Sequence, residues 1–273
     1  MTRALARRHA PRAVPGWLAV LAGVVLFYLV FPIFVIVPLS FSSGSYLSFP
    51  PPGWSLRWYA NFFGRSEWQS AMWLSVWIGV SVTVLACVLG TPAAFGLVRG
   101  KFPGKRLLNG FILSPIIVPG IIVAIGIYFV YARLGLIGNP AGLVLAHTCL
   151  AVPFVVINVS AALYGFDERL EQAALSLGAT PWRCFWQVTF PLIRPGVMAG
   201  AVFAFITSFD ELLVALFVSG TTAMTLPRLM WQEIRQDIDP TIAAASTLLL
   251  VLTTALLVTV ELLRRRGERL RNA

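Results

Sequence analysis

Long apolar stretches separated by short polar segments dominate the pattern of this chain. A helix that spans a bilayer needs about 20 consecutive, mainly apolar residues. Six stretches reach that length, at residues 17–39, 71–98, 107–131, 141–164, 196–218 and 241–263. Backbone polar groups inside lipid must find partners within their own segment, so each stretch is expected to be a helix. The pattern therefore predicts an all-α polytopic membrane protein with six transmembrane helices.

Two of the stretches contain features that predict irregularity. The third, 107–131, contains Pro115 and Pro119. Each proline removes a backbone donor, so this helix is expected to bend. The fifth stretch contains a small-xxx-small pattern, Gly196 to Gly200, which allows close approach of another helix and favours a packing role.

Composition agrees with a membrane protein. The chain of 273 residues is 58% hydrophobic and 12% charged, with a mean hydropathy of +0.82. Soluble proteins carry about 25% charged residues, and a soluble chain could not bury this much apolar surface. A net charge of +10 could indicate nucleic-acid binding. The basic residues flank the apolar stretches, however, as membrane topology requires.

The distribution of Lys and Arg predicts the orientation. With the N-terminus in the cytoplasm, 16 of the 21 basic residues fall in cytoplasmic segments and 5 in outer segments. This asymmetry predicts that both termini are cytoplasmic. Basic tails at 1–16 and 264–273 would then flank one membrane domain, 17–263. The first apolar stretch is too long for a signal peptide and lacks a cleavage site, so it is expected to remain as a helix in the cell membrane.

Residues 165–195 form the longest amphipathic interruption between apolar stretches, and the predicted topology places them in the cytoplasm. Gly178 suits the end of a first helix. Thr180 and Pro181 are typical of the start of a second. Pro191 and Pro195 are expected to mark the turn into the fifth membrane helix.

This predicted helix-turn-helix carries apolar and aromatic side chains, among them Leu170, Leu177, Trp182 and Trp186. An amphipathic helix outside the bilayer can lay such a face into a groove on another protein. An amphipathic loop lying on the membrane surface is the alternative from the residues alone.

Asp210 and Glu211 are the candidate residues of a translocation path. They lie about 14 residues into the fifth stretch, roughly 20 Å along a helix at about 1.5 Å per residue. Acids at such depth are functional candidates, although they could equally pair with a neighbouring helix and hold the bundle together. Thr207 and Ser208, one turn back, would extend the polar stripe.

Other chemistry finds little support. Residues 100–106 are one residue short of a G-x-x-x-x-G-K phosphate loop, and Arg106 stands where Ser or Thr would bind Mg²⁺. The Cys and His residues form no metal-ligand cluster, and His147 is expected to be a packed interior histidine. We therefore expect no catalytic residue, no metal and no cofactor on this chain. If ATP powers the protein, another chain binds it.

Residues 172–191 carry a family resemblance. Gln172-Ala173-Ala174, then Gly178, then Val188-x-Phe190-Pro191, match the spacing of the "EAA" loop of binding-protein-dependent ABC importer permeases: E-A-A, three residues, Gly, nine residues, Ile-x-Leu-Pro. The departures are Gln172 for Glu (Glu171 precedes it), Val188 for Ile and Phe190 for Leu. The resemblance implies the type I importer permease (MetI-like) fold, with the loop forming coupling helices that dock in a cleft of an ATPase subunit. The implied coupling residues are Glu171, Gln172, Ala173, Ala174, Gly178, Ala179, Trp182 and Pro191.

The resemblance extends over about residues 70–262. Segments such as Ser208-Phe209-Asp210-Glu211 and Thr225-Leu226-Pro227 look like the second permease subunit of spermidine/putrescine transporters. That class implies a second, different permease subunit, a cytoplasmic ATPase dimer that binds ATP and Mg²⁺, and a periplasmic substrate-binding protein. A polyamine is the implied solute, and a pair of acids would attract such a cation.

Other functions remain open at this stage. The same subgroup contains transporters of aminoethylphosphonate, opines and ferric iron. From other classes, the alternatives are a secondary transporter driven by protons through Asp210 or Glu211 and a purely structural membrane scaffold.

Overall fold

The computed structural model describes residues 15–236 and 238–272, with 263–272 as backbone alone. The regular structure of the described part is helical, apart from an isolated bridge between Ser42 and Trp54. In chain order its helices are α1 Gly16–Ser40, α2 Arg57–Gly64, α3 Ser66–Arg99, α4 Lys105–Ile117, α5 Gly120–Leu134, α6 Pro140–Tyr164, α7 Arg169–Ser176, α8 Pro181–Cys184, the π-helical turn η1 Phe185–Thr189, α9 Phe190–Phe209, α10 Leu213–Val218, α11 Leu226–Gln236 and α12 Thr241–Asn272.

Five helices of the described residues are long and apolar enough to cross a membrane. They are α1, α3, α6, the continuous helix Pro181–Phe209 and α12 through Leu262. A sixth span exists if α4 and α5 count as one, and these two are bent by 105° at their break. The all-α class is confirmed, and the expected six spans become five or six.

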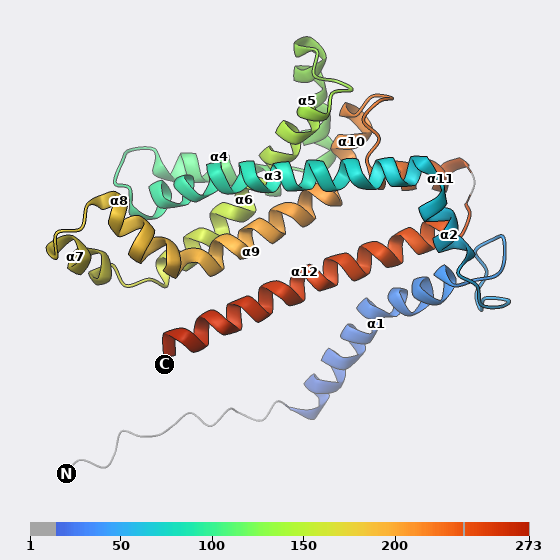
Figure 1. Ribbon diagram of the computed structural model, residues 1–273, viewed down its shortest axis with the longest axis horizontal. Coiled ribbons are helices and arrows are strands. Elements are labelled where there is room, and N and C mark those ends of the chain that lie inside the picture. Colours follow the sequence, from blue (N-terminus) through green and yellow to red (C-terminus); the bar gives the residue numbers. More distant parts are fainter. Residues whose placement is uncertain (1–14, 237, 273) are drawn as a thin grey trace.

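The core of the protein lies between α3, α6 and α9, which run side by side in Figure 1. Small residues permit this packing. A Cβ atom added at Gly90 of α3 would lie 2.8 Å from the Cβ of Val155, and one at Gly200 of α9 would lie 2.9 Å from the Val155 Cα. At Gly196 it would lie 2.8 Å from the Asn158 carbonyl oxygen. The small-xxx-small pattern thus packs within the subunit, against α6.

The third apolar stretch is two helices rather than one bent helix. Pro115 lies inside α4, and the break follows at Val118 and Pro119, where Pro119 precedes the first residue of α5. Residues before a proline avoid the helical region, and Val118 is extended. The bend was expected at these prolines, but a change of direction of this size was not.

The fifth and sixth apolar stretches also differ from expectation. The expected helix 196–218 ends at Phe209, and α10 begins separately at Leu213. The last helix continues to Asn272, so most of the basic tail 264–273 extends α12. The N-terminal tail 1–16 lies outside the described residues up to residue 14.

Figure 1 shows the segment α7–α8, the ends of α3 and α6 and the C-terminal end of α12 toward one end of the molecule. At the other end lie α2 and α11. There Arg65 donates a hydrogen bond of 2.9 Å to Glu233, and this hydrogen bond raises the pKa of Arg65. The side chain of Asn61 also donates to Thr241, 2.8 Å away. These contacts tie α2 and the residue that follows it to α11 and the start of α12.

Candidate functional site

Local capping forms the helix-turn-helix between α6 and α9. The Asp167 carboxylate accepts a hydrogen bond from the backbone N–H of Arg169 at the start of α7, 3.0 Å away. Gly178 follows α7 with φ +86°, a conformation that glycine adopts without strain. The hydroxyl of Thr180 accepts from the Arg183 N–H, and Pro181 begins α8. The predicted turn chemistry at Gly178, Thr180 and Pro181 is present.

The expected turn at Pro191 and Pro195 is wrong. Both prolines lie inside a continuous helix that runs from Pro181 to Phe209. The helix widens just before them, because the Phe190 N–H bonds to the Phe185 carbonyl in a π-helical turn. Such turns change the hydrogen-bond register where the α pattern is interrupted, and here the proline cannot donate. The second helix of the loop is therefore rigidly continuous with the fifth span.

A partly buried polar cluster anchors α7 to the rest of the protein. The Thr189 hydroxyl donates a hydrogen bond of 2.8 Å to the Glu171 carboxylate. Arg99, the last residue of α3, forms an ion pair with Glu168, and its guanidinium lies 4.0 Å from Glu171. The same guanidinium stacks over the ring of Phe166, 5.5 Å from its centroid. These contacts join the start of α7 to the end of α3 and to η1.

The outer face of this segment is apolar and accessible. Leu177 is 89% exposed and Trp182 is 71% exposed. The ring of Trp182 packs against Phe185 and Trp186, which form one aromatic cluster with Phe190, and Phe185 also contacts Phe95 of α3 at 5.5 Å. Exposed apolar side chains that pack on an aromatic cluster are typical of a surface that another protein covers.

The remaining expected coupling residues occupy both sides of the segment. Gln172, Ala173 and Pro191 are exposed, whereas Ala174 and Ala179 are half-buried. Sequence reasoning missed Arg99 and Thr189, which hold Glu171 in place. In the sequence Arg99 contributes only to the positive charge of the predicted cytoplasmic segments, and nothing local to either residue indicates this contact.

The four residues proposed for the path do not form one polar stripe. Asp210 ends α9 with an exposed side chain. Glu211 instead accepts a hydrogen bond of 2.9 Å from the Val214 N–H and so caps α10. Ser208 is buried and lies 3.1 Å from Nδ1 of His147, and Thr207 is half-buried. His147 is thus a packed interior histidine, as expected.

The two helix breaks lie beside each other. A Cβ atom at Gly120, the first residue of α5, would lie 3.0 Å from Cδ1 of Leu213, the first residue of α10. At the far ends of the same helices, the Gly138 N–H donates to the Val218 carbonyl, 2.8 Å away. Figure 1 shows α5 and α10 projecting together from the bundle. Broken helices of this kind bring free helix ends to one place within a membrane domain.

A match to a protein-family model identifies the family of this chain. The model described as "Binding-protein-dependent transport system inner membrane component" matches residues 86–269, which is well over half of the chain. The chain belongs to this family. It is the non-catalytic permease subunit of an ABC importer and a multi-pass protein of the inner membrane.

Relatives of the permease agree. It is 36% identical over 230 residues to the putrescine transport system permease protein PotI of Escherichia coli K12, which covers 82% of each chain. It is 33% identical over 267 residues to the molybdenum transport system permease protein ModB of Mycobacterium bovis, covering 92% of this chain and 94% of that one. The resemblance to polyamine permeases is confirmed, and it is shared with a permease named for another solute.

A solved structure supports the fold. The permease matches a chain of a bacterial ABC transporter involved in the import of the acidic polysaccharide alginate, with a TM-score of 0.69 and 17% sequence identity. The match covers 92% of this chain and 94% of that chain. The fold is therefore that of an ABC importer permease.

Proposed function

We propose that this permease forms one half of a translocation path that works by alternating access, and that residues 167–191 couple it to a cytoplasmic ATPase. The observation that carries the proposal is that a segment with exposed apolar side chains also contacts two spanning helices. Leu177 and Trp182 are the accessible surface, and Glu171 connects α7 to Thr189 and Arg99. The segment therefore has both a surface for a partner and a route by which a movement of that partner reaches the bundle.

The partners follow from the family and from this geometry. A dimeric ATPase supplies the nucleotide site, with ATP and Mg²⁺ bound by that partner. A second permease subunit completes the path, and a substrate-binding protein delivers the solute from outside. ATP and the loaded binding protein must favour the outward-open state, because a ligand shifts a conformational equilibrium only through its differential affinity for the two states.

The proposed solute is a polyamine. PotI is named for putrescine, and the Asp210 carboxylate is exposed and makes no hydrogen bond or ion pair with any described residue. An unpaired carboxylate in a partly desolvated site attracts an amine strongly. The similarity to ModB keeps other small solutes as the second candidate, and calorimetry on the cognate binding protein with putrescine, spermidine and molybdate separates them.

Reconstitution tests the mechanism. Proteoliposomes that contain both permease subunits, the ATPase and the binding protein should take up solute only when ATP is present. Uptake driven by a proton gradient in liposomes containing this chain alone would show a secondary transporter instead. Retention of full uptake after deletion of the ATPase partner would also overturn the proposal.

A further inference from the structure

A cavity of about 640 Å³ lies between the C-terminal end of α3, the first turns of α4 and the C-terminal half of α6. One part of its lining is apolar and comprises Leu97, Val98, Leu113, Val156, Ile157 and Ala161. The other part is basic or polar and comprises Lys105, Arg106, Asn109, Ser160 and Tyr164. The lining contains no acid, so its electrostatic character is positive.

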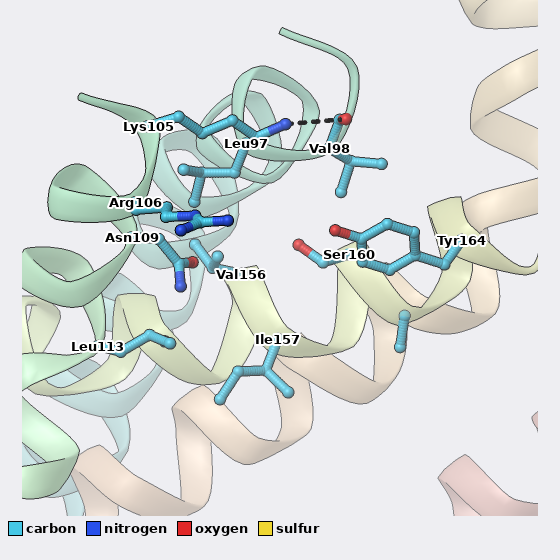
Figure 2. Close-up of a pocket in the computed structure, with 11 residues that line it drawn as sticks. Leu97, Val98, Lys105, Arg106, Asn109, Leu113, Val156, Ile157, Ser160 and Tyr164 are labelled. Carbon is cyan, nitrogen blue, oxygen red and sulfur yellow. Dashed lines mark hydrogen bonds between the residues drawn. The ribbon is translucent and has the colours of Figure 1, made fainter. Parts of the chain in front are cut away.

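Of the two basic side chains that line the cavity, Arg106 has no charged or hydrogen-bonding partner among the described residues. Lys105 is engaged, because its ammonium donates to the carbonyl oxygens of Val98 and Gly100 at 3.3 and 3.1 Å. Arg106 makes no hydrogen bond or ion pair with any described residue. Figure 2 shows its guanidinium between α4 and α6, directed toward the hydroxyl groups of Ser160 and Tyr164.

The first turn of α4, which contains Lys105 and Arg106, adds backbone N–H groups next to the cavity. Gly104 precedes α4 in a left-handed conformation, and no side chain caps the first turn of the helix. Uncapped N–H groups at a helix N-terminus favour an anion, and an arginine fork matches the oxygens of a phosphate group. Together with the two hydroxyl groups, these donors suit a phosphate.

The surroundings favour a phosphate that carries an apolar tail. The apolar lining continues from the polar end, and on α4 itself Leu107 is 80% exposed and Phe111 is 75% exposed. The cavity lies toward the end of the molecule that carries α7 and α8 (Figure 1), where the positive residues concentrate. Basic pockets between spanning helices on the cytoplasmic side suit anionic lipid headgroups.

We propose that this cavity binds one anionic phospholipid of the cytoplasmic leaflet. Arg106 and the first turn of α4 hold the phosphate, the hydroxyl groups of Ser160 and Tyr164 donate to its oxygens, and an acyl chain lies along Val156 and Ile157. The site adjoins the coupling segment, because Tyr164 is the last residue of α6 before the loop that leads to α7.

Native mass spectrometry of the full-length chain in detergent tests this site, with phosphatidylglycerol and phosphatidylcholine of identical acyl chains as probes. The wild-type chain should retain phosphatidylglycerol in preference to phosphatidylcholine. Arg106→Gln should lower phosphatidylglycerol retention about tenfold, the size expected for loss of one hydrogen bond to a charged group. Lys101→Gln is the matched control, because Lys101 is an exposed cation of the loop before α4 that does not line the cavity.

A second variant avoids the basic residues altogether. Ser160→Leu fills the cavity from α6 and should also lower retention, while the thermal unfolding temperature of each variant checks its folding. Equal retention in Arg106→Gln and Lys101→Gln, or equal retention of the two lipids, would overturn the proposal. Displacement of the lipid by millimolar inorganic phosphate would identify a free-phosphate site instead. Absence of the lipid from the assembled transporter, with binding only to the isolated chain, would show that the second permease subunit covers this surface.

Discussion

The carboxylate of Glu171 and the hydroxyl of Thr189 are joined by a hydrogen bond of 2.8 Å that links the first helix of the coupling segment to the π-helical turn before the fifth span. Thr189 is 2% exposed, so water does not readily replace this donor. The bond lies next to the Arg99 guanidinium. In the proposed mechanism, it lies on the route by which movement of α7 reaches α9.

Removal of this hydrogen bond should weaken coupling. Thr189→Val keeps the side-chain shape and leaves the Glu171 carboxylate without its donor. We expect it to weaken the binding free energy of the ATPase by about 1–2 kcal/mol. The dissociation constants of the ATPase for the wild type, Thr189→Val, Glu171→Gln and the double variant give a double-mutant cycle. We expect a coupling energy of about 0.5–3 kcal/mol. Additive effects of the two substitutions would show that the pair is not coupled.

Gly178 tests whether the turn itself contacts a partner. A Cβ atom there meets nothing within 4 Å, but φ is +86°. Gly178→Ala should therefore cost only about 1 kcal/mol in backbone strain, whereas Gly178→Asp adds a charge to the docking surface and should abolish uptake. Uptake and the amount of subunit in the membrane are measured together.

Gly135→Asp is the control for the turn substitution. Gly135 has φ +66° and also has nothing within 4 Å of its Cβ position, so the strain is similar, but it follows α5 and lies outside the coupling segment. Normal uptake in Gly178→Asp, or equal loss in both variants, would refute a docking role for this turn.

Trp182 should be a hot spot for the ATPase. It is 71% exposed, and its ring packs against Phe185 and Trp186. Truncation of a central aromatic anchor typically costs 2 kcal/mol or more, so Trp182→Ala should weaken ATPase binding by about 30-fold or more. Trp54→Ala is the matched control, because Trp54 is 72% exposed at the other end of the chain's fold. Similar binding by both variants would exclude Trp182 from the interface.

Hydrophobic pattern and turn chemistry predicted much of this protein. Stretches of apolar residues located the spans, because lipid forces long apolar segments into helices. Gly178, Thr180 and Pro181 predicted the ends of the loop helices, since each residue type has a local conformational preference. These features depend on neighbouring residues and can be read directly from the chain.

The break after Phe209 and the contact of Arg99 with Glu171 could not be predicted in this way. Residues 196–218 contain no proline, and the acids at 210 and 211 are compatible with a helix. The break is visible only in three dimensions, where α10 lies against α5. Likewise, the partner of Arg99 comes from a distant segment, so no spacing in the sequence indicates it.

Asp210 and Glu211 should behave differently, although they are adjacent and both acidic. Glu211 accepts a hydrogen bond from the Val214 N–H, and an amide oxygen can accept the same bond. Glu211→Gln should therefore retain folding and most uptake. Glu211→Ala removes the cap of α10 and should cost about 1 kcal/mol of stability, measured as a lower thermal unfolding temperature in detergent.

Asp210 makes no such bond, so Asp210→Asn should leave the unfolding temperature unchanged. If its carboxylate attracts the solute, the same substitution should raise the KM for a divalent cationic solute such as putrescine in the reconstituted transporter. Stimulation of ATP hydrolysis by the empty binding protein should not change, because the coupling segment is intact. Unchanged uptake kinetics in Asp210→Asn would remove this residue from the path, whereas a lowered unfolding temperature would assign it a structural role.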